Sequence, residues 1–241
     1  MKGANILGRL SALLATGFQK QMHVFDVVSN NLSNVQTAGF KREVPLFRQV
    51  LSASKAPLFL QTKEEIGTVF EQGELQRTGN PLDLAIEGEG FFRVKTPSGV
   101  RYTRAGNFRM NREKTLIHES GFPVLGRQGE VTLRGREIVV EKNGSIKADG
   151  VEIDQIVPVT FRDLRALKRE GNGLFRLEGS QPEAPAEESQ LLQGSLELSN
   201  VNPVQEMVKL IECLRSYESC AKMIHSNDEM DSKASNELGR I

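Results

Sequence analysis

Residues 5–32 decide the fold, and they read NILGRLSALLATGFQKQMHVFDVVSNNL. Apolar side chains recur in this stretch every three or four residues, at Leu7, Leu10, Leu14, Phe18, Met22, Phe25, Val28 and Leu32. The same spacing returns near the other end of the chain, at Val204, Met207, Ile211, Leu214, Ala221 and Ile224. Because an α-helix has about 3.6 residues per turn, each series lies on one helix face. The sequence therefore predicts an amphipathic helix at each end, pairing with the other helix or with further copies of the chain.

The first predicted helix runs into a segment rich in asparagine, with Asn30, Asn31 and Asn34 followed by Gly39 and Phe40. Asparagine and glycine tolerate the left-handed backbone that ends helices, so we interpret this segment as a helix-terminating turn. A recognition patch is the alternative interpretation of the three asparagines. Gly39 is expected to set the turn and Phe40 to insert into an interface, although in an isolated globule the same phenylalanine would be core.

The second predicted helix has a clear start, with Asn202 as the N-cap and Pro203 as the first helical residue. Both cysteines, Cys213 and Cys220, lie within it. Two helical turns separate them by roughly 10 Å, which exceeds the reach of a disulfide. We therefore expect free thiols.

Between the helices the hydrophobic period changes to two, beginning at Leu82. A Thr-Pro-Ser-Gly turn at residues 96–99 predicts a β-hairpin, and Asn-Gly and Asp-Gly pairs punctuate the strands that follow. The predicted fold class is α+β, with long N- and C-terminal helices forming a coiled-coil-like layer and a central, mainly antiparallel β domain. The expected organisation is a helix and turn over 1–40, an extended linker over 41–80, the β domain over 81–190 and the C-terminal helix over 191–241.

The composition excludes several classes of function. Lysine plus arginine equals aspartate plus glutamate at 31 each, so the formal net charge is zero and gives no electrostatic footprint for nucleic acid. The sequence shows no cleavable signal peptide and no apolar run long enough to insert into a membrane. The three histidines fall in separate elements, and no side chains are arranged by sequence for catalysis. We therefore expect no enzyme activity, no metal and no cofactor.

Three stretches resemble the axial proteins of the bacterial flagellar rod and hook. Residues 27–42, VVSNNLSNVQTAGFKR, are similar to the N-terminal signature of that family, with Ser33 where alanine is more usual. Residues 78–92, TGNPLDLAIEGEGFF, form the second stretch, and the third runs from LELSNVN at 196–202 through residues 206–208 to RSYE at 215–218. The three stretches occur in the family's order and span essentially the whole chain, and the chain length favours a rod protein, proximal rather than distal.

The resemblance implies a structural subunit that polymerises through its terminal helices and transmits torque from motor to hook. It also implies export through the flagellar type III channel without signal cleavage. The partners it implies are other copies, other rod and hook axial proteins, and that export machinery, at the basal-body rod that spans the periplasm. The residues expected to make assembly contacts are Leu14, Phe18, Phe25, Val28, Asn30, Asn31, Asn34, Gly39, Phe40, Asn80, Asp83, Asn200, Val201, Met207, Ile211, Arg215, Tyr217 and Glu218.

Other interpretations remain open at this point. Arg215, Tyr217 and Glu218 suit a packed interface, but a solvated helix face would carry the same residues. A distal rod or hook subunit is the alternative within the family. A secreted adhesin or binding module would present the β domain as its binding face and fold as a stable monomer. A peptidoglycan hydrolase would need a carboxylate constellation, which the sequence does not display.

Overall fold

The computed structural model describes residues 3–51 and 60–238, and the chain divides into two compact units. We call residues 1–33, 43–67 and 202–241 the helical unit, and residues 34–42 and 68–201 the strand unit. No helix in the described ranges has the length and apolar content needed to span a bilayer.

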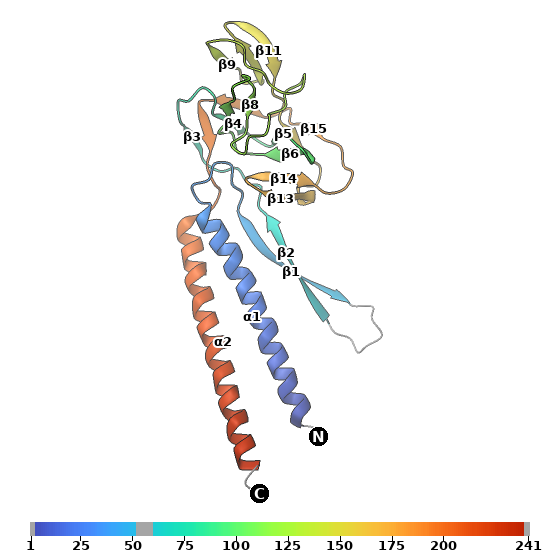
Figure 1. Ribbon diagram of the computed structural model, residues 1–241, viewed down its shortest axis with the longest axis vertical. Coiled ribbons are helices and arrows are strands. Elements are labelled where there is room, and N and C mark those ends of the chain that lie inside the picture. Colours follow the sequence, from blue (N-terminus) through green and yellow to red (C-terminus); the bar gives the residue numbers. More distant parts are fainter. Residues whose placement is uncertain (1–2, 52–59, 239–241) are drawn as a thin grey trace. The chain divides into compact units, whose positions relative to one another are not determined.

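The helical unit contains α1 (Gly3–Ser33) and α2 (Pro203–Leu238), which lie side by side, together with the two-stranded sheet of β1 (Glu43–Leu51) and β2 (Leu60–Thr68) (Figure 1). Val27 and Val28 are buried on α1. The start of α2 confirms the predicted cap, because the Asn202 side-chain oxygen accepts the backbone N–H of Gln205 at 3.1 Å.

The strand unit is built from short strands in small antiparallel sheets. Its largest sheet has the order β13-β14-β6-β5, and a three-stranded sheet has the order β11-β10-β9. The remaining pairs are β3 with β17, β4 with β16, β7 with β8 and β12 with β15. The strand bounds are β3 Leu75–Arg77, β4 Leu84–Glu87, β5 Phe92–Thr96, β6 Gly99–Thr103, β7 Arg109–Met110, β8 Leu116–Ile117, β9 Ile138–Val140, β10 Ser145–Ala148, β11 Val151–Gln155, β12 Val159–Thr160, β13 Leu167–Gly171, β14 Leu174–Leu177, β15 Ala184–Pro185, β16 Gln190–Gln193 and β17 Ser195–Glu197, with a 3₁₀ turn at Leu164–Ala166.

Two apolar clusters hold the strand unit together. Phe92 belongs to the larger one, with Leu84, Ile86 and other, mostly aliphatic side chains from along the unit. Its neighbour Phe91 belongs to a smaller, aromatic cluster that includes Phe175. Because successive residues of an extended chain point to opposite faces, the adjacent phenylalanines serve both clusters.

The predicted hairpin turns are confirmed. β5 and β6 pair with Thr96 opposite Gly99, as the turn at residues 96–99 requires. The Asp-Gly pair at 149–150 connects β10 to β11, with φ values of 50° and 86° that suit a tight hairpin.

The predicted fold class is wrong. In the described ranges the chain is mostly strands, with two α-helices against seventeen β-strands, and the terminal helices do not form a coiled-coil-like layer. The apolar series that was expected to seal that layer is exposed on α2, where Val204, Met207 and Ile211 are 68%, 50% and 51% exposed. What faces inward on α2 is instead Glu206 and Cys213, at 1% and 5%. A polar and small face therefore lies inside, and periodicity alone could not show which face of the helix is covered.

Candidate assembly site

In the helical unit, Asn31 connects α1 to β1. Its amide nitrogen donates to the backbone oxygen of Glu43 at 2.8 Å, and its side-chain oxygen accepts the Glu43 N–H at 2.8 Å. A carboxamide can make this reciprocal pair because it carries a donor and an acceptor side by side, as a peptide group does. The same nitrogen reaches the Glu206 carboxylate at 3.2 Å, so one buried side chain joins both helices to the sheet.

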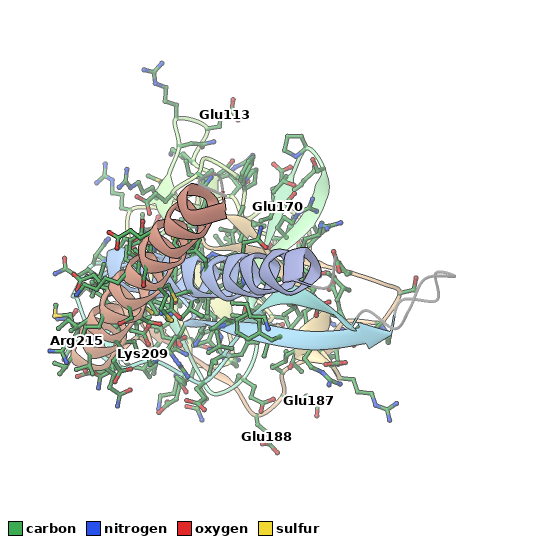
Figure 2. The ribbon with its side chains drawn as sticks, turned by 90° about the horizontal axis from the view of Figure 1, so that it is seen from below. Glu113, Glu170, Glu187, Glu188, Lys209 and Arg215 are labelled. Carbon is green, nitrogen blue, oxygen red and sulfur yellow. The ribbon has the colours of Figure 1, made fainter. Side chains whose placement is uncertain are left out.

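Glu206 and its neighbours complete this polar contact. Lys209 donates to the Glu206 carboxylate at 2.6 Å, one helical turn along α2, and Asn30 donates to the Glu43 carboxylate at 2.7 Å. In Figure 2, which shows the protein from below, Lys209 and Arg215 are labelled on α2. The carboxylate of Glu206 is buried but has a cation and an amide as partners, which offsets the cost of removing it from water.

In the strand unit, the turn over residues 34–40 is fixed by its backbone. The Thr37 N–H donates to the carbonyl of Asn34 at 3.1 Å. Gly39 has φ +66°, and a Cβ at this position would lie 2.2 Å from the backbone nitrogen of Ala105. No side chain fits there, so glycine is required by space as well as by conformation. Gly39 N–H then donates to the carbonyl of Glu197 at 2.7 Å.

Glu197 is the centre of a buried ionic cluster. Its carboxylate accepts from Lys41 Nζ at 2.5 Å, from Arg104 Nη1 at 3.1 Å and from the Gly73 N–H at 2.9 Å. The side chains of Glu197 and Lys41 are completely buried, and that of Arg104 is nearly so. Burial lowers the pKa of Lys41 and of Arg104, against the opposing attraction of Glu197. One carboxylate thus compensates two cations inside the protein.

Arg104 and Asn200 extend this cluster to neighbouring strands. Arg104 donates to the carbonyl oxygens of Ile86 and Gly88 at 3.3 and 2.7 Å. Asn200 accepts the Arg42 N–H at 2.7 Å and donates to the carbonyl oxygen of Val69 at 2.9 Å. Three segments of the stretches singled out in the sequence, residues 34–42, 78–92 and 196–201, therefore meet around Glu197 within the strand unit.

Known proteins match this chain over most of its length. Residues 192–237 match the family described as flagellar basal body rod FlgEFG protein C-terminal, and residues 85–156 match the flagellar hook protein FlgE/F/G D1 domain. The flagellar basal-body rod protein FlgF of Caulobacter vibrioides is 36% identical over 95% of this chain and 98% of its own length. The chain belongs to the flagellar basal-body rod protein family. FlgG of Borreliella burgdorferi and FlgF of Rhizobium meliloti are each 32% identical, over 92% and 89% of this chain and 96% and 91% of their own lengths.

The structure places the residues predicted for rod assembly in three groups, in the strand unit, on α1 and on α2. Those in the strand unit are engaged inside it. Phe40 is buried with the Arg169 guanidinium 4.0 Å from its ring centre, and Asp83 accepts from Thr78 at 2.7 Å and from Asn80 at 2.9 Å. The others of this group are Asn34, Gly39 and Asn200 in the contacts above, and Val201, which is buried.

The predicted residues on α1 line the contact between the helices. Phe18 packs on Tyr217 of α2 with 5.1 Å between ring centres, and Val28 is buried. Phe25 lines an apolar hollow of about 220 Å³, together with Cys213 and other residues of both helices. Leu14 lies in α1, and its side chain is outside the described residues.

The predicted residues on α2 are the exposed ones. Met207, Ile211 and Tyr217 are 50%, 51% and 42% exposed, and Arg215 and Glu218 are exposed as well. Both cysteines are free, and burial raises the pKa of the Cys213 thiol, which keeps it protonated and unreactive.

Five charged residues that organise the interior of this rod-family protein were not among the predicted site residues, namely Lys41, Glu43, Arg104, Glu197 and Glu206. Lys41 and Glu197 do lie within the stretches that resemble the family, and an isolated charge beside apolar residues in such a stretch was an available signal. Arg104 lies in an ordinary strand end and carries no comparable signal.

Proposed function

We propose that this protein is a structural subunit of the flagellar basal-body rod, in its proximal part, and that it assembles with other copies and with other rod and hook proteins. The observation that carries the proposal is the end-to-end match to the FlgF rod protein of Caulobacter vibrioides at 36% identity. The FlgG rod proteins match at about the same length with 29–32% identity, which favours the FlgF-like, proximal position. As a structural subunit it catalyses no reaction, and it transmits torque from motor to hook.

The exposed face of α2 supports assembly through the helical unit. Val204, Met207, Val208, Ile211 and Leu214 follow helical spacing and are each at least 46% exposed. Burying half of an aliphatic side chain contributes about 1 kcal/mol. A contiguous row of five such side chains is therefore a suitable surface for a neighbouring subunit.

Export through the flagellar type III channel without signal cleavage belongs to the same proposal. It accords with the free cysteines, since a chain without disulfides has no cross-link to undo before it threads through a channel. The rod would then lie in the basal body, outside the cytoplasm.

A variant of α2 tests the proposal in a strain that lacks this protein. The parent chain is expected to restore swimming, and Ile211→Glu is expected to fail, because a carboxylate would be buried without a partner at the subunit contact. The matched control is Ser219→Glu, which places the same side chain at an exposed polar position of α2. Restored swimming with Ile211→Glu would show that this face of α2 is not part of the assembly surface. No restoration by the parent chain would contradict the rod function itself.

A further inference from the structure

The strand unit carries two oppositely charged surfaces. One is an open hollow of about 710 Å³ whose lining includes Arg77 and Arg136. The other is a turn over residues 186–189 with Glu187 and Glu188 at its tip. We propose that the hollow of one copy receives the Glu187–Glu188 turn of the next copy, which would add a head-to-tail contact between strand units to the rod assembly proposed above. This inference rests on the proposed function.

The lining of the hollow contains two arginines and one glutamate, Glu137, and is therefore net positive. Among the described side chains neither Arg77 nor Arg136 has an ion-pair partner, whereas the buried arginine of the Glu197 cluster does. Two carboxylates lie near, those of Glu137, which lines the hollow, and Asp149. The carboxylate of Asp149 is engaged by the backbone N–H groups of Arg136 and Glu137, each at 3.0 Å, and so leaves the guanidinium available.

The hollow also has an apolar part. Met110 and Val139 line it and are 49% and 42% exposed. A charged rim beside exposed apolar side chains is the usual composition of a protein contact surface, because the apolar part supplies burial and the charges supply orientation. A volume of about 710 Å³ admits the tip of a turn rather than a small ion alone.

The acidic turn is held in place before any partner arrives. The Ser189 N–H donates to the carbonyl of Ala186 at 3.1 Å, which closes the turn. Ala186 N–H donates to the carbonyl of Pro158 at 2.9 Å, and the Ser189 hydroxyl donates to the carbonyl of Glu89, so both ends are tied to neighbouring segments of the chain. Figure 2 shows Glu187 and Glu188 pointing outward from the ribbon. A turn that is already ordered loses little conformational entropy on binding.

The positions of the two surfaces require the contact to be intermolecular. The hollow is lined from β3 and β9, and the turn follows β15, which lies on the other side of the strand unit (Figure 1). One chain cannot bring its own turn to its own hollow. Two different surfaces that bind each other between copies give a heterologous contact, which propagates along an assembly instead of closing into a dimer.

Charge reversal in the full-length chain tests this contact. We call Arg77→Glu/Arg136→Glu the hollow variant and Glu187→Arg/Glu188→Arg the turn variant. In a solution of either variant alone, every contact would place like charges against each other. Self-association, measured by sedimentation velocity at low salt, is therefore expected to be at least about tenfold weaker than that of the parent chain. In an equimolar mixture, each hollow meets a turn of opposite charge, and association is expected to return to within about threefold of the parent.

The mixture separates this contact from a folding defect, because misfolded variants would not rescue each other. Glu113→Arg is the control, since it reverses an exposed glutamate on another turn and should leave association unchanged. Parent-like association of either variant alone, a mixture as weak as its components, or a parent chain that stays monomeric at millimolar concentration would each overturn the contact. Restored swimming by the parent chain in a strain lacking the protein would still support the rod function, so the two failures are distinguishable.

Discussion

Replacing Glu197 by glutamine should destabilise the strand unit more than any other change of a single charge. The substitution keeps the size of the side chain but removes the negative charge that contacts both Lys41 and Arg104, which are buried. It also turns one acceptor oxygen into an NH₂ group, which would point a donor at a donor. Removing one partner of a buried ion pair costs about 3–5 kcal/mol, and here two cations lose the same partner. We therefore expect the free energy of unfolding of the strand unit to fall by at least about 3 kcal/mol.

Tyrosine fluorescence can follow the strand unit alone. The chain has no tryptophan and two tyrosines, Tyr102 in the strand unit and Tyr217 in α2. In a Tyr217→Phe background, urea unfolding followed by the fluorescence of Tyr102 reports the unit that contains Glu197, and far-UV circular dichroism checks whether the transition is two-state.

The matched control is Glu178→Gln. Glu178 also pairs with an arginine, Arg176, at 2.8 Å, but both side chains are about half exposed. An exposed pair contributes about 0–1 kcal/mol, so the control should unfold almost as the parent does. A loss below about 1 kcal/mol for Glu197→Gln, equal to that of the control, would refute the argument that this carboxylate holds the cluster together.

Three further results are expected. Gly39→Ala should destabilise the strand unit by clearly more than Gly79→Ala in urea unfolding. Both glycines have positive φ, but a Cβ at Gly39 would lie 2.2 Å from backbone, whereas a Cβ at Gly79 would meet nothing within 4 Å. Equal losses of unfolding free energy would show that the turn at Gly39 can rearrange to admit a side chain. Asn31→Ala should lower the thermal midpoint of the helical circular dichroism signal, because the buried N–H and C=O of Glu43 lose their partners, and each unsatisfied group costs about 1–3 kcal/mol. An unchanged midpoint would show that Asn31 does not stabilise the contact between α1 and β1. Burial lowers the pKa of His118 below its ordinary value of about 6.5. Below a pH of about 6.5 the unfolded state therefore binds more protons than the folded state, and the free energy of unfolding should fall with falling pH by at most about 1.4 kcal/mol per pH unit. This pH dependence should shrink in His118→Gln, and an identical dependence in this variant would show that other groups cause it.

The local signals of the sequence were reliable where a short stretch decides the outcome. Asn202 and Pro203 start a helix because a side-chain acceptor and a missing N–H suit that position whatever surrounds it. The Asp-Gly pair between β10 and β11 turns the chain for a similarly local reason.

The long-range features could not be predicted in the same way. The periodic apolar residues of α2, among them Met207 and Ile211, predicted a covered face, but within one chain α1 covers the face with Glu206 and Cys213. Periodicity shows that a face is apolar and does not show whether the same chain or a neighbour covers it. Likewise, 156 positions separate Lys41 from Glu197, so their pairing depends on how the strands are arranged in space.

The acidic turn and the arginine-lined hollow illustrate the same limit. Glu187 and Glu188 lie in a polar, proline-containing segment in which no periodic pattern singles them out. Their significance comes from the turn that displays them and from Arg77 and Arg136 in a distant part of the strand unit. These charges form two surfaces of opposite sign only in the folded structure, and their order in the sequence does not reveal it.

The most direct test of the central claim is electron microscopy of basal bodies purified from a strain that lacks this protein, with and without the restored chain. The account predicts basal bodies without a complete rod and without hooks, and complete rods with hooks once the chain is restored. Complete rods carrying hooks in the strain that lacks the protein would contradict its role as a structural subunit of the rod.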